Sequence, residues 1–250
     1  MGKKKDYQLN GQLCFDFNTN TEHYVVQSNE LLEGKQNLKL NSAKIVRALI
    51  MQIKPDDEEL KSYFISVQEL AKMLHISAAN LYRDMDTITD DILTNHVAIK
   101  DYQQGKFMKI QWVTACVYEK GVGLAVKMNP LLKPFLLGLQ ERYTQYQLEN
   151  ILAMKSVYAI RIYELLMKEQ MTRFIPADGV SVILAIKTIR EACDCETKYE
   201  KISQFKSKVI DIAVKEICRC TSYTVSYECL KKGRSIEAFR FHLNSKYNKI

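Results

Sequence analysis

A group of polar and basic side chains late in the chain has the composition of a surface that reads nucleic acid. In the helical segment that begins near Lys198, apolar side chains point inward and leave Ser203, Gln204 and Ser207 outward. A glutamine amide can bond both N6 and N7 of adenine, and a serine hydroxyl can bond either groove edge. The flanking lysines, which suit phosphate or guanine, are Lys201, Lys206 and Lys208. An isolated lysine-rich helix could also be a solvated surface. The predicted elements around it must therefore decide between a DNA-binding helix and a solvated one.

A second basic group lies on a turn between two alternating segments, 223–230 and 234–243. Lys231, Lys232 and Arg234 surround Gly233 there. Long cationic side chains at a hairpin tip can reach backbone phosphates without disturbing a core. The alternative is a turn whose lysines serve solubility.

The first half of the chain holds a less basic counterpart. Asn80, Tyr82 and Arg83 are outward positions of a helix that follows a tight turn, and Asn80 could read adenine. Asp84 and Asp86 follow closely and lower the positive charge. Direct DNA contact, a weaker auxiliary contact and a protein-contact surface therefore stay open for this helix.

Apolar spacing predicts helices over 41–53 and 66–74, and a third that begins at Ser77. Asn41 and Ser77 are candidate N-caps, and Ser66 with Glu69 three residues later predicts a capping box. Two helices joined by a tight turn are then followed by alternating segments. The strands expected there cover 97–102, 106–113 and 122–130.

The second half predicts the same order of elements. Helices are expected over 131–143, 146–170, 182–195 and 198–220. The first of them would bridge two domains, with Pro134 near its start. In the last of them, one side is expected to be apolar and buried through Ile202, Phe205, Val209, Ile212 and Ala213. The two strands around Gly233 complete a helix-turn-helix with a wing.

These patterns predict an α+β fold of two tandem winged-helix domains. A chain of 250 residues is long enough for two domains of ordinary size. We expect an N-terminal arm over 1–36, a first winged-helix domain with a connecting helix over 37–147, and a second winged-helix domain over 148–250.

The distribution of charge favours a polyanionic partner for the second half. Residues 1–130 hold 16 basic and 16 acidic side chains, whereas residues 131–250 hold 20 and 13, so the whole net charge of +7 lies there. No apolar run approaches the roughly 18 residues of a membrane span. The seven cysteines are an odd number in a chain long enough to fold without disulfides. We therefore expect a cytoplasmic protein with no membrane partner.

Enzymatic functions find little support in the sequence. It has no phosphate-binding loop, and Gly121 and Gly123 stand without the rest of a dinucleotide fingerprint. A rolling-circle nickase would need a nucleophilic tyrosine, for which Tyr143 and Tyr146 are candidates, together with a His-x-His metal site that is missing. Two cysteine pairs, 193/195 and 218/220, have only one intervening residue, where zinc pairs usually have two to four. We expect no catalytic residue, no metal and no cofactor.

Several segments resemble a known family. They are LENILAMKSVYAIRIYELL, IKTIREAC, KYEKISQFKSKVIDIAVKEI and YTVSYECLKKGRSIEAFRFHL. In order and spacing they resemble the twin winged-helix initiators of bacterial iteron plasmids, the Rep family of initiator replication proteins. The similarity runs from about Asn37 to Tyr247 and is most specific over Ser156–Leu166 and Tyr199–Phe241. The principal DNA-reading helix of the family would fall on Lys201, Gln204, Lys206, Ser207 and Lys208, and its wing on Lys231, Lys232 and Arg234.

The resemblance implies a protein that binds direct repeats in double-stranded origin DNA, helps to open adjacent DNA and recruits the host initiator and replicative helicase. It also implies self-association through the first domain, with dimers repressing the protein's own promoter at an inverted repeat. Some members carry more arginines along the reading helix, and lysine gives up planar bidentate recognition, which puts particular base contacts in doubt. The alternatives are a winged-helix transcription regulator, an origin nickase and a protein-interaction scaffold without DNA affinity.

Overall fold

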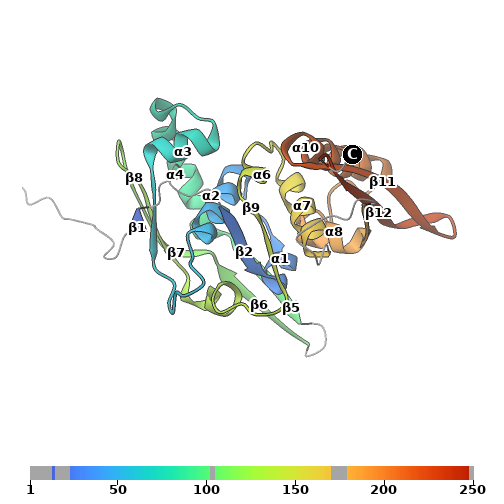
Figure 1. Ribbon diagram of the computed structural model, residues 1–250, viewed down its shortest axis with the longest axis horizontal. Coiled ribbons are helices and arrows are strands. Elements are labelled where there is room, and N and C mark those ends of the chain that lie inside the picture. The colour runs from blue at the N-terminus through green and yellow to red at the C-terminus, as the bar shows by residue number, and fades with distance from the viewer. Residues whose placement is uncertain (1–12, 15–22, 102–104, 170–178, 248–250) are drawn as a thin grey trace, which may run out of the picture.

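The protein contains two winged helices whose apolar residues form one continuous core (Figure 1). The computed structural model describes residues 13–14, 23–101, 105–169 and 179–247. Each winged helix has a helix, a strand, two helices and two strands in this order along the chain. The predicted fold class of two tandem winged helices is confirmed.

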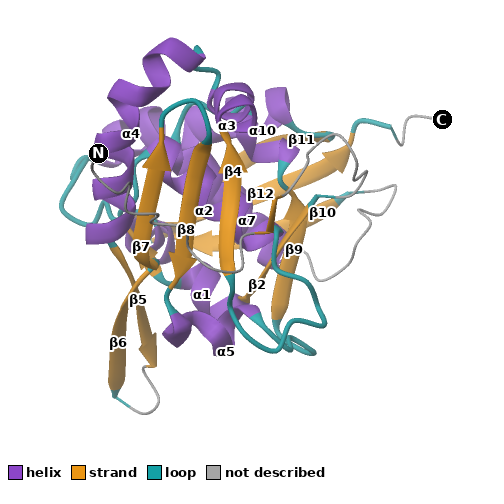
Figure 2. Ribbon diagram, turned by 90° about the vertical axis from the view of Figure 1, so that its left-hand side faces the viewer, coloured by secondary structure: helices purple, strands orange, loops and turns teal. Residues whose placement is uncertain are grey.

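The first winged helix is built around a sheet in which β4 and β7 both pair with β8 in antiparallel fashion (Figure 2). The predicted capping box is confirmed, since Ser66 Oγ accepts from the Glu69 N–H and the Glu69 carboxylate accepts from the Ser66 N–H. Ser77 caps the next helix, also as predicted. The elements are α2 (Leu40–Met51), β4 (Ser62–Ser66), α3 (Val67–Leu74), α4 (Ala78–Thr94), β7 (Val113–Glu119) and β8 (Gly123–Met128).

The second winged helix repeats this arrangement. Its sheet has the order β10-β12-β11, and the first has β4-β8-β7, so the third strand is central in both. The helix that precedes the two wing strands runs from Ile202 to Cys220 and is called the long helix below. The other elements are α7 (Val157–Glu169), β10 (Val180–Ala185), α8 (Ile186–Ala192), β11 (Tyr223–Lys232) and β12 (Ser235–Ser245).

Further elements surround the two winged helices. The hairpin of β5 and β6 is inserted between α4 and β7, and β9 pairs with β2 near the N-terminus. Residues 24–36, which we expected in an arm, form β2, α1 and β3, so this part is built into the folded first half. These elements are β1 (Leu13–Cys14), β2 (Tyr24–Ser28), α1 (Asn29–Glu33), β3 (Lys35–Gln36), β5 (His96–Asp101), β6 (Lys106–Gln111), η1 (Pro130–Leu132), α5 (Lys133–Leu136), β9 (Tyr143–Gln147) and α6 (Glu149–Leu152).

Several local predictions are wrong. The single helix expected over 146–170 is broken, because Tyr146 and Gln147 belong to β9, α6 covers only Glu149–Leu152, and the next helix begins at Val157. The bridging helix over 131–143 reduces to η1 and α5, and the chain then continues into β9, because pairing with β2 satisfies the backbone there. The helix over 182–195 begins only at Ile186, because the preceding residues pair with β12. Asn41 is no cap: the helix begins at Leu40, and the preceding Lys39 N–H donates to an Asp91 carboxylate oxygen on α4 at 2.9 Å.

No helix within the described part of the chain combines the length and the apolar character that crossing a membrane requires.

Candidate nucleic-acid interface

The long helix exposes almost all of the residues predicted to read DNA. Lys201, immediately before it, and Ser203, Gln204, Ser207 and Lys208 are exposed. The Ser207 hydroxyl donates to the Gln204 carbonyl at 3.2 Å, which leaves its oxygen free to accept. Lys206 is half-buried, because its ammonium lies 5.7 Å from the centroid of the Tyr227 ring. The helix therefore presents a polar and cationic surface from its first turn.

The long helix is interrupted by a π turn at Lys206–Ile210. The Asp211 N–H donates to the Lys206 carbonyl, five residues earlier, where a regular α-helix would use a spacing of four. The turn therefore holds one extra residue, and Val209 and Ile210 are both buried.

The predicted apolar side of the long helix is partly wrong for this reason. Phe205, Val209 and Ala213 are fully buried, as predicted. Ile202 is 36% exposed and Ile212 is 37% exposed. Ile202 lies at the first turn of the helix. The extra residue of the π turn shifts the buried positions by one, so that Ala213 is buried in place of Ile212, followed four residues later by Ile217.

The turn before the long helix is held by Arg190, a residue that the sequence analysis missed. Its guanidinium donates to the carbonyl oxygens of Cys195, Lys198 and Tyr199 at 3.0, 2.6 and 2.7 Å. The same group lies 4.2 Å from the centroid of the Phe205 ring. Arg190 thus connects the turn to the helix. Its position in the expected amphipathic segment 182–195 did not predict this role.

The wing of the second winged helix carries the other predicted cations. Lys231 and Lys232 end β11, Arg234 lies in the turn, and all three are exposed. Gly233 has a φ of 62°, a left-handed conformation that glycine adopts without strain. These side chains reach into solvent from a hairpin that extends beyond the body of the protein (Figure 1).

In the first winged helix, Asn80, Tyr82 and Arg83 are exposed at the start of α4. The Tyr82 ring lies 6.2 Å from the Tyr118 ring of the wing strand β7, and a lysine ammonium, that of Lys120, lies 5.3 Å from the Tyr82 centroid. Arg83 Nε donates to an Asp84 carboxylate oxygen at 3.0 Å, which compensates part of its charge. This surface is more aromatic and less cationic than that of the second winged helix.

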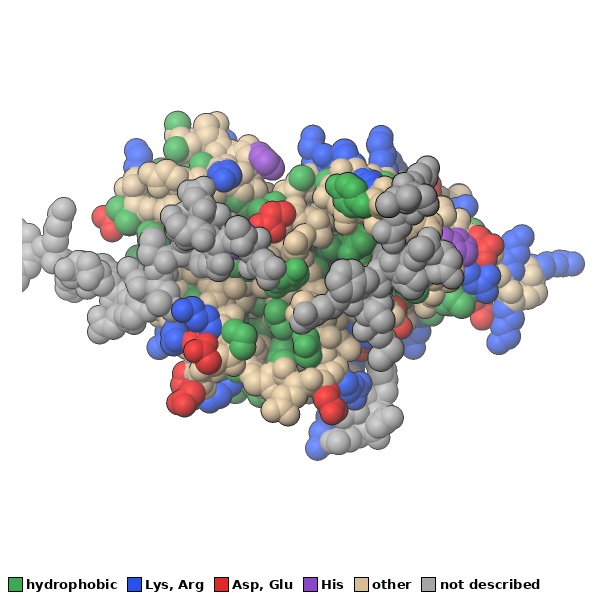
Figure 3. All heavy atoms as spheres, viewed as in Figure 1, with side chains coloured by type: hydrophobic (Ala, Val, Ile, Leu, Met, Phe, Trp, Pro, Cys, Tyr) green, Lys and Arg blue, Asp and Glu red, His purple; other side chains and the backbone are tan. Residues whose placement is uncertain are grey.

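Helices of both winged helices lie along one edge of the molecule (Figures 1 and 2). The α3–α4 pair and α10 (Asp211–Cys220), the last part of the long helix, share the upper edge in Figures 1 and 2. In Figure 3 lysine and arginine side chains gather at the upper right, over the second winged helix, and at the projecting wing. A double strand could therefore meet both winged helices from the same side.

A buried ionic cluster lies where α2, β9 and α7 meet, and we call it the junction: Arg47 of α2, Tyr146 of β9, and Arg161 and Glu164 of α7. Arg47 Nε and Nη2 donate to the two Glu164 carboxylate oxygens at 3.0 and 3.1 Å, and Tyr146 Oη donates to the first of them at 2.5 Å. Arg161 forms an ion pair with the same carboxylate. All four side chains are buried.

Arg161 also connects the two winged helices through backbone groups. Its guanidinium donates to the carbonyl oxygens of Leu32 and Gly34 near the N-terminus at 2.5 and 3.0 Å, and to that of Ala192 in α8 at 3.2 Å. This cluster was not predicted from the sequence. Two opposite charges within the apolar run IRIYELL were its only sequence signal.

The junction makes the stability of the folded protein dependent on pH in the acidic range. Burial by itself would raise the pKa of the Glu164 carboxyl, but the guanidinium groups of Arg47 and Arg161 and the Tyr146 hydroxyl hold it at about 2, below the ordinary 4.5. A carboxyl with a depressed folded-state pKa stabilises the fold fully above its unfolded pKa, and this contribution is lost as pH falls toward the folded value. We expect the urea midpoint to fall as pH drops from about 5 toward about 2, with a smaller fall in Glu164→Gln. Equal slopes in the two proteins would contradict the depressed pKa.

Tyr146 and the first of the two cysteine pairs singled out from the sequence are buried. Tyr146 is buried in the junction, where burial and the Glu164 carboxylate raise its pKa well above the ordinary range. Cys193 and Cys195 are buried thiols, and burial raises the pKa of Cys195 to about 11. Among the described residues, no three His, Cys, Asp or Glu side chains are grouped so as to hold a metal ion.

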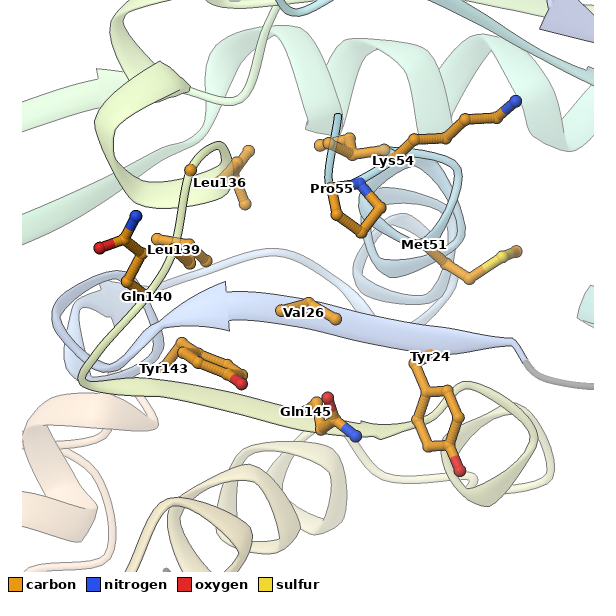
Figure 4. Close-up of a pocket in the computed structure, with 12 residues that line it drawn as sticks. Tyr24, Val26, Met51, Lys54, Pro55, Leu136, Leu139, Gln140, Tyr143 and Gln145 are labelled. Carbon is orange, nitrogen blue, oxygen red and sulfur yellow. The ribbon is translucent and has the colours of Figure 1, made fainter. Parts of the chain in front are cut away.

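Tyr143 lines a groove of 630 Å³ between the outer face of β2–β9, the end of α2 and the residues after α5 (Figure 4). The described side chains that line it include no carboxylate, histidine or cysteine, and the Lys54 ammonium points away from the other labelled groups. The lining residues are Tyr24, Val26, Met51, Ile53, Lys54, Pro55, Leu136, Gly138, Leu139, Gln140, Tyr143 and Gln145.

Comparison with known families assigns both winged helices. The family description "Initiator Replication protein, WH1" matches residues 24–167, and "Initiator Rep protein, WH2" matches residues 185–243. The chain belongs to the initiator replication protein family. The resemblance noted from the sequence is confirmed. The WH1 match of this initiator replication protein includes both the α3–α4 pair and the junction residues, and its WH2 match includes the long helix and the wing.

Individual relatives of this initiator replication protein are distant. A "Replication initiation protein" of Escherichia coli is 24% identical over 153 residues, which cover 60% of this chain and 48% of that protein; the matched part spans about half of the relative's length. An "Uncharacterized 27.6 kDa protein" of Escherichia coli is 21% identical, covering 90% of this chain and 96% of the relative. The crystal structure of Pi initiator protein in complex with iteron DNA has a TM-score of 0.77 and 18% identity, covering 91% of this chain and 99% of that one.

Proposed function

We propose that this protein is a plasmid replication initiator that binds direct repeats, or iterons, in double-stranded origin DNA through both of its winged helices. The observation that carries the proposal is the long helix, which exposes serine, glutamine and lysine side chains beside a basic wing. The family and the fold shared with an initiator solved on iteron DNA support the same conclusion.

The exposed side chains divide between two kinds of contact. Gln204 has an amide that can pair with adenine, and Ser203 and Ser207 can bond either kind of base edge. Lys201, Lys206 and Lys208 at the helix, and Lys231, Lys232 and Arg234 on the wing, would neutralise phosphates and fix the position of the helix in the major groove. Asn80, Tyr82 and Arg83 would make the contact of the first winged helix.

Opening of the origin requires no catalytic residue in this proposal. Binding to successive repeats would bend the DNA, and the accumulated binding energy would promote separation of adjacent strands. We further propose that the protein recruits the host initiator and the replicative helicase, works in the cytoplasm, and associates with itself through the first domain. In the dimeric form it would repress its own promoter at an inverted repeat.

Nuclease protection across the DNA that flanks the gene tests the proposal. The expected result is a series of equally spaced protected blocks, which would identify direct repeats. Protection confined to one inverted promoter repeat would overturn the initiator function in favour of a transcription regulator with the same winged helices. Absence of any protection would overturn DNA recognition altogether.

The lysines of the long helix provide a quantitative test. We expect Lys206→Ala combined with Lys208→Ala to weaken binding to the protected repeat by on the order of 1 to 3 kcal/mol and to lower the salt dependence of binding, because phosphate contacts are lost. Affinities measured over a series of salt concentrations check both effects. Lys106→Ala with Lys109→Ala, two exposed lysines on β6 at the opposite edge, is the control with the same change of charge. Equal effects of the two double variants would show that net charge alone acts.

A further inference from the structure

Tyr227 of β11 contacts both ends of the π turn in the long helix. Its hydroxyl donates to an Asp211 carboxylate oxygen at 2.6 Å, and its ring centroid lies 5.7 Å from the Lys206 ammonium. Lys206 and Asp211 are the two residues that the five-residue backbone hydrogen bond joins. One side chain of the wing thus contacts the first residue of the π turn and the residue that directly follows the turn.

Tyr227 is itself held in place by the aromatic core. Its ring packs edge-on against Phe239 at 5.4 Å and lies 6.0 Å from Phe241, while Phe239 lies 6.3 Å from Phe205 of the long helix. The position of the ring is therefore set by its packing against β12. Burial and the Asp211 carboxylate raise the pKa of the Tyr227 hydroxyl, so the hydroxyl keeps its proton and remains a donor.

The π turn determines which way the two parts of the long helix face. In a regular α-helix each residue advances by about 100°, so one extra residue in a turn rotates the following part by roughly that angle relative to the preceding part. The core holds the preceding part through Phe205 and the following part through Ala213 and Ile217, and the π turn allows all three to be buried together. The direction of Gln204 and Ser207 toward a groove consequently depends on whether the turn is present.

We propose that Tyr227 is a positioning residue that holds the π turn and thereby sets which base sequence the long helix selects. The inference rests on the proposed DNA-binding function and deepens it. Tyr227 need not touch DNA, because it acts through Lys206 and Asp211. The wing would then have two roles. Its tip would contact DNA phosphates, and its base would fix the orientation of the long helix.

The substitution Tyr227→Phe distinguishes an effect on sequence selectivity from an effect on the stability of the fold. The ring and its aromatic contacts stay, and Asp211 is exposed, so loss of the hydroxyl leaves no buried charge. The full-length wild-type protein and the full-length variant would each select duplexes from a randomised pool. The affinity of both proteins would then be measured for the duplex that the wild-type protein selects and for a scrambled duplex. We expect the preference for the selected sequence to fall roughly tenfold, with binding to the scrambled duplex and the melting temperature nearly unchanged. Tyr223→Phe, the same change on the same strand, is the control and keeps the preference.

Asp211→Ala shows whether the hydroxyl acts through Asp211. Removing this acidic group changes general attraction to DNA, but the ratio of selected to scrambled binding cancels that change. We expect each single variant and the double variant to lose the preference to the same extent, and faster hydrogen exchange at the Asp211 amide in each. Unchanged preference and exchange in Tyr227→Phe would overturn the inference. If the wild-type protein selects no sequence, the proposed function fails instead, whereas the exchange rate still reports whether Tyr227 holds the turn.

Discussion

Glu164→Gln is expected to destabilise the folded protein by about 3 to 5 kcal/mol, the cost of breaking a buried ion pair. The glutamine fills nearly the same space but carries no charge, so the guanidinium groups of Arg47 and Arg161 lose their common counter-charge in a site closed to water. The Tyr146 hydroxyl also loses a charged acceptor. Free energies of unfolding from urea titration near neutral pH measure the effect.

Glu169→Gln is the matched control for this prediction. Glu169 ends the same helix, is exposed and pairs with its neighbour Lys168 on the surface, so its substitution should change the free energy of unfolding by less than about 1 kcal/mol. Similar small effects of both substitutions would show that the junction is not a structural cluster.

In the proposed function, the junction also matters for DNA binding. Arg47 lies on α2 and Glu164 on α7, and Arg161 bonds carbonyl groups of Leu32, Gly34 and Ala192. Groups held in this way fix the position of α7 relative to α2 and α8. In the proposed function, that relation determines whether both winged helices can meet successive grooves of one repeat.

Local sequence patterns predicted much of the fold and of the candidate interface. The capping box of Ser66 and Glu69 requires only residues three positions apart, and it forms as expected. The wing around Gly233 needs only a two-residue turn between alternating strands. The outward positions of Ser203, Gln204 and Ser207 follow from helical spacing over one or two turns, because the irregular turn changes the phase only of the residues that come after it.

Features that depend on distant partners were not predictable in this way. The apolar segment from Leu131 to Tyr143 has helical spacing, yet it gives way to β9 because β2, more than a hundred residues earlier, supplies a strand partner. Glu164 likewise finds Arg47 only in the folded chain, 117 residues away. A sequence shows that two charges lie in an apolar run, but it does not show what neutralises them.

Phe205→Ala is expected to destabilise the second winged helix by about 3 to 5 kcal/mol, since it removes a fully buried ring and leaves a cavity. The ring lies between Phe239 and the Arg190 guanidinium, and neither group can fill the space without giving up other contacts. Thermal or urea unfolding measures the loss. Ile212→Ala is the informative comparison: a regular helix would bury Ile212 with Phe205, whereas the π turn leaves it 37% exposed, so we expect a change within about 1 kcal/mol. Comparable losses in the two variants would mean that the long helix is regular, and the role assigned to Tyr227 would then lose its structural basis.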